Sequence, residues 1–419
     1  MIQLTRLENQ TEILMETVAN TNVVSIGFWI KTGSRDESPE QAGFSHFLEH
    51  MLFKGTKKRN ALDIAKEIDR LGGSINAYTE HEVCCFYCSL PYFHLDNAIE
   101  VLSDIITQSV LDADEIEKEK SVVIHEIISA YDSPEETGID LYLSDFWGDH
   151  PLGNKITAEV DQIKKISRNK LLEFYYERYL PHNLTVSVAG RFEVNYLVKL
   201  LQDNLIFKNE SCFEINRVIP KRIEKWRFIK DRFKQVHIYS GMQIKDMKTI
   251  KSYYSLLVFS TLFGESMSSR LFQHIREKYG FCYSIYSFRS NFSDTSLLTL
   301  YACTTPDFFI PLIKAIENEW SLLLKEFIDV KEIEDAKSHL KGSMLLFMED
   351  MEGRMKRLFR VYHNTGSLLE VDSALLLLDE VNLNDLKILV HDNVKADNFN
   401  LLAYGCPRIK RFEQSKFLF

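Results

Sequence analysis

Two histidines and a glutamate in the segment His46-Phe47-Leu48-Glu49-His50 have types and spacing that could bind a metal ion. In a helix, with about 100° of rotation per residue, His46, Glu49 and His50 share one side. The other side then carries the apolar residues Phe44, Phe47, Leu48 and Met51. One face of such a helix can be buried, while the other offers two imidazole nitrogens and a carboxylate to a metal.

A third ligand must come from elsewhere in the chain, because a catalytic zinc usually has three protein ligands and keeps one position for water. The predicted helix 113–132 contains Glu119 and Glu126, which are seven residues apart and therefore share a face. One of the two can bind the metal, while the other orients a histidine or adds charge behind it. The spacing alone leaves this choice open.

Glu49 has a different expected role, because its neighbour His50 already occupies the metal-facing side. We expect Glu49 to accept a proton from the metal-bound water, whose pKa falls to about 7 on zinc. It would then pass that proton to a leaving amine. The His-x-x-Glu-His order is the reverse of the His-Glu-x-x-His order of many zinc peptidases, so the pattern predicts amide hydrolysis.

Length and composition limit the class of protein. A chain of 419 residues is longer than one hydrophobic core usually supports, which predicts two domains. A net charge of -10 disfavours nucleic acid as a partner. The chain has no apolar run of about 18 residues, so no membrane span is expected. Its first residues lack the apolar run of a secretory signal, which predicts a cytoplasmic location.

The cysteines agree with a reducing compartment, because seven is an odd number for a disulfide framework. Cys84, Cys85 and Cys88 lie close together in an apolar segment with no second cysteine pair. We therefore expect them to be buried residues of a strand and not metal ligands.

Hydrophobic periodicity predicts the same succession of elements in both halves of the chain. In the first half, strands are expected at 23–32, 74–79, 82–90 and 184–189, and helices at 61–71, 93–109, 113–132 and 170–179, besides the helix of the histidine motif. In the second half, strands are expected at 235–242, 282–288, 296–303 and 399–404, and helices at 253–263, 269–278, 306–326, 330–348 and 383–391.

This repetition predicts an α+β fold of two similar domains, each a mainly antiparallel sheet packed against helices. We place the domains at residues 1–207 and 225–419. Residues 208–224 lose periodicity and carry mixed charge with Pro220, so they are predicted to be the linker.

With these features in place, the chain resembles the pitrilysin-like inverzincin zinc peptidases, a family that includes the β-subunit of the mitochondrial processing peptidase. The resemblance extends in order through both halves of the chain, over residues 43–56, 72–79, 117–126, 267–271 and 276–283. It implies a chain similar to the bacterial half-length members, with two domains that form one half of a clamshell.

The resemblance also implies one zinc ion per chain and resolves the choice of the third ligand. In the family, the ligand glutamate follows the second histidine by about 76 residues and is preceded by another glutamate seven residues earlier. Glu126 has this position relative to His50 and Glu119. It therefore implies His46, His50 and Glu126 as zinc ligands, Glu119 as a supporting carboxylate and Glu49 as the general base.

Two further pairs of residues match family positions that contact substrate. Asn76 and Ala77 match an edge strand to which an extended peptide is added as a further strand. Arg276 and Tyr283 match a pair that in the family reaches the substrate and the developing oxyanion. In the family this pair comes from the opposite half, so the resemblance implies a homodimer. A heterodimer with a related chain is an alternative.

Together these observations predict a zinc metalloendopeptidase that hydrolyses extended or unfolded peptides in an enclosed dimeric chamber. A non-catalytic scaffolding or regulatory subunit of a processing-peptidase-like complex is the alternative, although such chains usually lose motif residues that are present here. A structural zinc module is less favoured, because structural sites usually fill all four positions with cysteine or histidine. The sequence does not choose between presequence processing and general clearance of oligopeptides.

Overall fold

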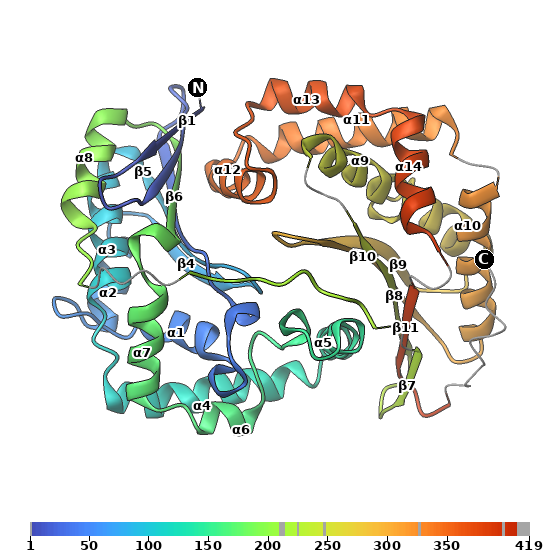
Figure 1. Cartoon of the computed structure of the whole chain (residues 1–419), viewed down its shortest axis with the longest axis horizontal. Helices are drawn as coiled ribbons and strands as arrows, with labels where there is room; N and C mark the ends of the chain where they lie inside the picture. Colours follow the sequence, from blue (N-terminus) through green and yellow to red (C-terminus); the bar gives the residue numbers. More distant parts are fainter. Residues whose placement is uncertain are drawn as a thin grey trace. The chain divides into compact units, whose positions relative to one another are not determined.

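The computed structural model describes residues 2–208, 214–223, 226–245, 249–325, 328–395 and 399–408. The chain forms two compact units (Figure 1). The first comprises Met1–Ser129, Asn154–Val218 and Leu346–Glu370, and the second comprises Ala130–Gly153, Ile219–Leu345 and Val371–Phe419. Each unit therefore includes a segment from the opposite half of the chain. This exchange of segments between the halves was not predicted from the sequence, which placed one linker at 208–224. The domain boundaries 1–207 and 225–419 stay a prediction.

The first unit is built on a sheet whose described strands have the order β1-β2-β6-β3-β5-β4. Neighbouring strands are antiparallel, except that β2 and β6 are parallel. The strands are β1 (Ile2–Arg6), β2 (Glu12–Thr17), β3 (Val23–Ile30), β4 (Ser74–Thr79), β5 (Cys84–Pro91) and β6 (Leu184–Gly190). The helices are α1 (Phe44–Leu52), α2 (Ala61–Asp69), α3 (Leu95–Gln108), α4 (Ala113–Ala130), α6 (Val160–Lys164), α7 (Arg168–Arg178), α8 (Val194–Asn204) and α12 (Met351–Thr365).

The second unit is built on a sheet whose described strands have the order β7-β11-β8-β10-β9. The strands are β7 (Trp226–Lys230), β8 (Val236–Ile244), β9 (Ser284–Asn291), β10 (Ser296–Thr304) and β11 (Phe399–Gly405). The α-helices are α5 (Pro134–Trp147), α9 (Ile250–Ser260), α10 (Phe309–Lys325), α11 (Val330–Phe347), α13 (Val371–Glu380) and α14 (Leu383–Asn393). Two π-helical turns, η6 (Thr261–Glu265) and η7 (Phe272–Glu277), follow α9.

The two sheets have the same topology. Strands β2 to β6 of the first sheet correspond in chain order to β7 to β11 of the second, and the order across each sheet is the same once β1 is set aside. In both sheets the strands that come first and last in chain order, β2 and β6 or β7 and β11, are parallel neighbours. The other neighbouring strands of each set are antiparallel. This arrangement confirms the predicted α+β fold of two similar domains.

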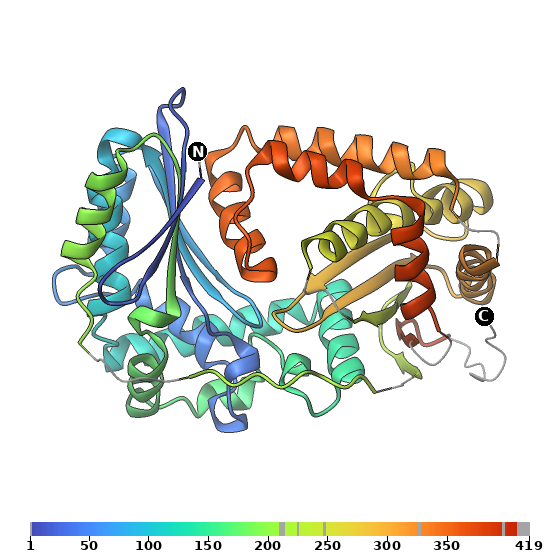
Figure 2. The same cartoon turned by 45° about the horizontal axis from the view of Figure 1, so that its top comes forward.

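Side chains of β3 alternate between two hydrophobic clusters, as expected of a strand that is covered on both faces. Ile26 and Phe28 pack into the cluster that includes α3, while Trp29 packs into the cluster that includes α12. The rings of Trp29 and Phe359 of α12 are stacked, with centroids 4.0 Å apart. Figure 2 shows α12 against one face of this sheet and α3 and α8 on the other.

The exchanged helices α5 and α12 cover equivalent positions of the two sheets, and a glycine lies under each. A Cβ atom at Gly27 of β3 would lie 2.4 Å from the Met355 sulfur of α12. A Cβ atom at Gly241 of β8 would lie 2.7 Å from the Tyr142 hydroxyl of α5. Each glycine is the fourth residue from the end of its strand. The exchange therefore depends on a small residue at the same place in each sheet.

The state of the cysteines and the hydropathy of the helices can be compared with the sequence analysis. The cysteines that the structure describes are free and buried, and Cys84, Cys85 and Cys88 lie in β5 as predicted. None of the helices in the described ranges combines the length and the hydropathy needed to cross a membrane.

Two glycine-to-alanine substitutions in the second unit should change stability in opposite directions. In Gly241→Ala the new Cβ would lie 2.4 Å from the Leu298 carbonyl oxygen, so we expect overpacking to lower the free energy of unfolding by about 1–3 kcal/mol. In Gly342→Ala, within α11, the Cβ meets no atom within 4 Å, so we expect a gain of about 0.5–1 kcal/mol from helix propensity. Urea denaturation of both variants measures the difference, and a stable Gly241→Ala protein would contradict the close approach.

Candidate metal centre

The helix that carries the histidine motif, α1, begins at a defined point. Gly43 precedes it with φ 81°, and a Cβ there would lie 2.7 Å from the Cβ of Ala158. The buried Glu37 carboxylate accepts the backbone N–H groups of Gly43 at 2.8 Å and Ser45 at 2.6 Å. Helix N-terminal N–H groups need such a partner when they are buried. Burial raises the pKa of Glu37 to about 7.

The structure brings His46, His50 and Glu126 together, with one possible ligand atom of each within 4.8 Å of the others. His46 Nε2 lies 3.6 Å from Glu126 Oε1, and His50 Nε2 lies 3.6 Å from Glu126 Oε2. These distances are too long for good hydrogen bonds. They fit ligands that share a tetrahedral zinc, because ligand atoms 2.0–2.1 Å from the metal are about 3.4 Å from one another. The donor set of two imidazoles and a carboxylate also suits zinc.

The orientation of the His50 ring is set by Glu119. His50 Nδ1 lies 2.9 Å from Glu119 Oε1, which leaves Nε2 to face Glu126. A metal-binding histidine usually donates its other ring N–H to a carboxylate or carbonyl in this way. Glu119 is buried on α4, and its second oxygen lies 2.6 Å from Lys54 Nζ. The two glutamates of α4 therefore have different contacts. Glu126 faces Nε2 of both histidines, whereas Glu119 contacts Nδ1 of His50.

Glu49 lies on the same helix as the two histidines, and the hydroxyl of Thr79 donates a hydrogen bond of 2.5 Å to its Oε2. Thr79 is the last residue of β4. Burial raises the pKa of the Glu49 carboxyl group, while the Thr79 hydrogen bond opposes this shift. A raised pKa makes a carboxylate a stronger base, which favours its acceptance of a proton.

Interactions between the histidines and the glutamates of the cluster shift the pKa values of His50, Glu119 and Glu126 in the direction that favours their charged forms. The pKa of Glu126 is lowered, first by its interaction with His46. Burial alone would lower the pKa of His50, but the hydrogen bond to Glu119 and the neighbouring carboxylates raise it overall. Burial would raise the pKa of Glu119, but His50 and Lys54 lower it. Acidic groups thus surround the two imidazoles, an environment that favours a bound cation.

Asn76 and Ala77 lie on β4, which is the last strand of its sheet among the described residues. They pair with Tyr87 and Phe86 of β5 on one side. The backbone N–H of Ala77 donates to the side-chain oxygen of Asn76 at 2.8 Å. A strand with an open edge can pair with an extended peptide. This strand also ends at Thr79, the residue that contacts Glu49.

Arg276 and Tyr283 lie in the second unit, whereas the other predicted site residues lie in the first. The Arg276 guanidinium lies over the Phe272 ring at 4.5 Å, within the π-helical turn η7. Tyr283 immediately precedes β9 and is 76% exposed. The roles predicted for these two residues, and for Asn76 and Ala77, stay predictions.

Three residues near the site were not assigned a role from the sequence: Glu37, Lys54 and Thr79. Lys54 follows His50 by four residues, but α1 ends at Leu52, so this spacing gives no signal of the contact between Lys54 and Glu119. Thr79 is the last residue of the predicted substrate strand, 74–79. Glu37 lies in a loop and had no such signal.

The second unit has no equivalent of the metal cluster among its described residues. The helix α9 holds the place of α1 in chain order, because α1 lies between β3 and β4 and α9 lies between β8 and β9. Its sequence, IKSYYSLLVFS, contains no histidine, cysteine or carboxylate. Among the described residues, the candidate metal cluster therefore lies in one of two domains with the same topology.

Comparisons with known protein families match both parts of the chain. Residues 12–159 match the family described as Insulinase (Peptidase family M16). Residues 165–340 match the family described as Peptidase M16 inactive domain. The first match contains the candidate cluster, and the described residues of the second match contain no comparable one.

Curated relatives align over nearly the whole chain. The uncharacterized zinc protease YmxG of Bacillus subtilis is 33% identical over 394 residues, which cover 91% of this chain and 93% of the relative. A Mycobacterium tuberculosis protein, also named an uncharacterized zinc protease, is 30% identical over 389 residues, which cover 91% of this chain and 88% of the relative.

Solved structures show the same fold at lower sequence identity. A protease from Helicobacter pylori has a TM-score of 0.90 at 22% identity and covers 97% of this chain and 99% of its own. A peptidase M16 inactive domain protein from Pseudomonas fluorescens has a TM-score of 0.88 at 14% identity, with 98% and 99% covered. With family matches in both halves and relatives of 30% identity or more along most of its length, this chain belongs to the insulinase family of peptidases, M16.

Proposed function

We propose that this protein is a zinc-dependent metalloendopeptidase that hydrolyses extended or unfolded peptides. The single observation that carries the proposal is the cluster of His46, His50 and Glu126, with Glu49 on the same helix. The names of the relatives, zinc proteases, support zinc as the metal. One ion per chain is proposed, because the described residues of the second unit hold no comparable cluster.

Each residue of the proposed site has a separate role in amide hydrolysis. Zinc, when bound, supplies a Lewis acid at the scissile amide. His46, His50 and Glu126 hold it, and Glu119 keeps the His50 ring in place. Glu49 takes a proton from the attacking water and returns it to the leaving amine. Thr79 holds the Glu49 carboxylate through the hydrogen bond to Oε2, so it acts as a positioning residue.

The substrate is proposed to bind along β4 as an added antiparallel strand. Asn76 and Ala77 lie on this edge, and backbone pairing selects an extended peptide without reading most side chains. The Asn76 side chain occupies the Ala77 N–H in the free protein, so a peptide carbonyl would replace it. This mode suits unfolded chains and short peptides, in keeping with either presequence processing or oligopeptide clearance.

The active protein is proposed to be a homodimer with an enclosed chamber. Arg276 and Tyr283 of one subunit would then face the metal of the partner and donate hydrogen bonds to the developing oxyanion. The high exposure of Tyr283 supports this assignment, because a side chain that reaches a second subunit must be accessible on its own. A cytoplasmic location is proposed from the sequence.

A non-catalytic scaffolding or regulatory role is not favoured. The metal-binding residues and Glu49 are all present in the chain, and the relatives that align over most of its length are named zinc proteases.

The variant Glu49→Gln tests the general base. We expect kcat for an internally quenched peptide to fall by about 10²–10⁴-fold, because proton transfer is lost, while zinc content stays near that of the wild type. Metal analysis of the same preparation separates loss of base from loss of zinc. Wild-type activity in Glu49→Gln would remove Glu49 from the mechanism.

The companion variants Thr79→Val and Thr79→Ser control for the position of the base. Valine has nearly the same shape but cannot donate to Glu49, so kcat should fall about 10-fold, with KM and zinc content unchanged. Serine keeps the hydroxyl and should retain most of the activity.

A two-tag experiment tests the shared site. Glu49→Gln and Tyr283→Phe chains carrying different tags are co-expressed and purified through both tags, so that only mixed dimers remain. Each mixed dimer has one site with both residues intact, and we expect roughly half of the wild-type activity, above that of either variant alone. Failure to isolate mixed dimers, or activity no higher than that of the single variants, would contradict a site built from two subunits.

A further inference from the structure

We propose that Lys54 is a positioning residue of the metal centre, which holds Glu119 so that Glu119 can aim His50 at the metal. The proposal rests on the metal site of the proposed function but not on its peptidase activity. It concerns the affinity of the protein for zinc, which can be measured without substrate.

The contacts of Glu119 carry the proposal. Its two carboxylate oxygens have separate partners: Oε1 lies 2.9 Å from His50 Nδ1 and Oε2 lies 2.6 Å from Lys54 Nζ. A carboxylate held at both oxygens cannot rotate about its side-chain bonds without breaking one contact. Lys54 therefore fixes the plane of the carboxylate that fixes the plane of the imidazole.

Burial makes this contact more important than an ordinary surface ion pair. The Glu119 side chain is 5% exposed, and that of Lys54 is 29% exposed. A buried carboxylate without a cationic partner carries a large desolvation cost. Without Lys54, we expect Glu119 to turn toward solvent, and this movement weakens its hydrogen bond with His50.

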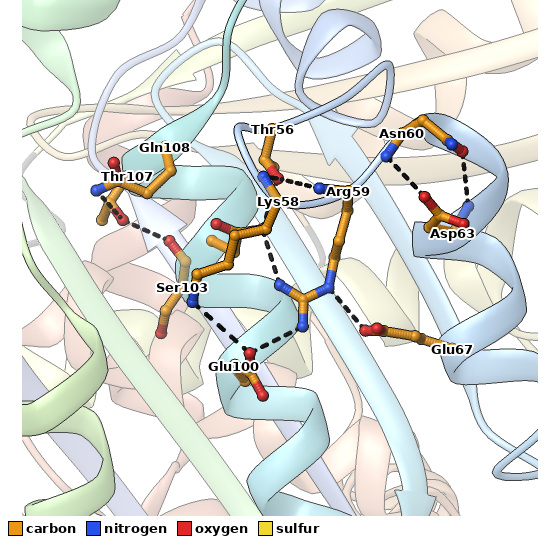
Figure 3. Close-up of polar contacts among 11 residues, drawn as sticks. Thr56, Lys58, Arg59, Asn60, Asp63, Glu67, Glu100, Ser103, Thr107 and Gln108 are labelled. Carbon is orange, nitrogen blue, oxygen red and sulfur yellow. Dashed lines mark hydrogen bonds and ion pairs between the residues drawn. The ribbon is translucent and has the colours of Figure 1, made fainter.

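The loop that carries Lys54 is fastened to the fold independently of the metal ligands. Thr56 and Arg59 of this loop bind Asp104 of α3, at 2.6 Å and 2.9 Å. Arg59 also donates to Glu67 of α2 and Glu100 of α3 (Figure 3). The Arg59 side chain is 8% exposed, so this network anchors the loop from within the protein. Lys54 thus reaches Glu119 from a backbone that α2 and α3 hold.

Removal of Lys54 should change the zinc affinity in the direction opposite to that expected from charge alone. An ammonium group near a divalent cation repels it, so charge alone would make zinc binding tighter when Lys54 is removed. If Lys54 acts by holding Glu119, zinc binding becomes weaker, because supporting residues of metal ligands typically contribute about 10–100-fold in affinity.

The experiment measures the zinc dissociation constant of metal-free protein by competition with a chromophoric chelator. Lys54→Met should raise the dissociation constant by about 10–100-fold. Lys57→Met is the matched control: it removes the same charge from the same loop at an exposed position and should leave the constant unchanged. Lys54→Arg should restore most of the affinity, because a guanidinium can also pair with Glu119.

A double-mutant cycle shows whether Lys54 acts through Glu119. In a Glu119→Gln background, Lys54→Met should have little further effect on zinc binding, since the carboxylate it holds is gone. Unchanged or tighter zinc binding in Lys54→Met, or equal effects in both backgrounds, would overturn the proposal. If Lys54→Met does not fold, as judged by circular dichroism, Lys54→Gln replaces it in the same cycle. A wild-type protein that binds zinc but cleaves no peptide would contradict the proposed function and leave the role of Lys54 intact.

Discussion

The proposed metal centre depends on the hydrogen bond between His50 Nδ1 and Glu119. His46 and His50 are brought together by one turn of α1, but Glu126 is on α4, more than seventy residues later in the chain. Glu119 joins the two helices, because it is on α4 and contacts the ring of a residue on α1. The same contact leaves Nε2 of His50 directed toward Glu126. The geometry of the proposed ligands therefore depends on the Glu119 carboxylate as much as on the ligands themselves.

The surrounding fold holds α1 from three sides. Glu37 caps its first turn, and Thr79 of β4 contacts Glu49 in its middle. After its last turn, the loop that carries Lys54 is anchored to α3 by Arg59. The apolar face of α1, including Phe47, packs into the core of the first unit. These contacts keep the polar face of the helix in one orientation without using the ligands themselves.

The sequence predicted the parts of the site that follow from local periodicity. The histidine motif lies on a helix as predicted, and the strand Ser74–Thr79 and the helix with both glutamates were placed within a few residues of their observed bounds. The choice of Glu126 over Glu119 required the family resemblance, because seven-residue spacing puts both on one face of α4. The glutamate that faces Nε2 of both histidines is determined by the packing of α4 against α1. Local sequence patterns carry no information about that packing.

Long-range contacts were the part that the sequence did not predict. Helices α5 and α12, which exchange between the compact units, were not predicted, and neither was Glu37 as the cap of α1. α5 combines a glycine with a weak separation of apolar and polar faces, so its periodicity gives little signal. Its place is set by the close approach of Gly138 to the Tyr239 ring, a contact between residues a hundred positions apart.

The most direct test of the central claim is a crystal structure of the zinc-loaded protein with anomalous data collected on both sides of the zinc absorption edge. The account predicts one anomalous peak per chain at about 2.0–2.1 Å from the ligand atoms of His46, His50 and Glu126, with Glu119 behind His50. A peak held by other residues, or Glu126 turned away from the metal, would contradict it.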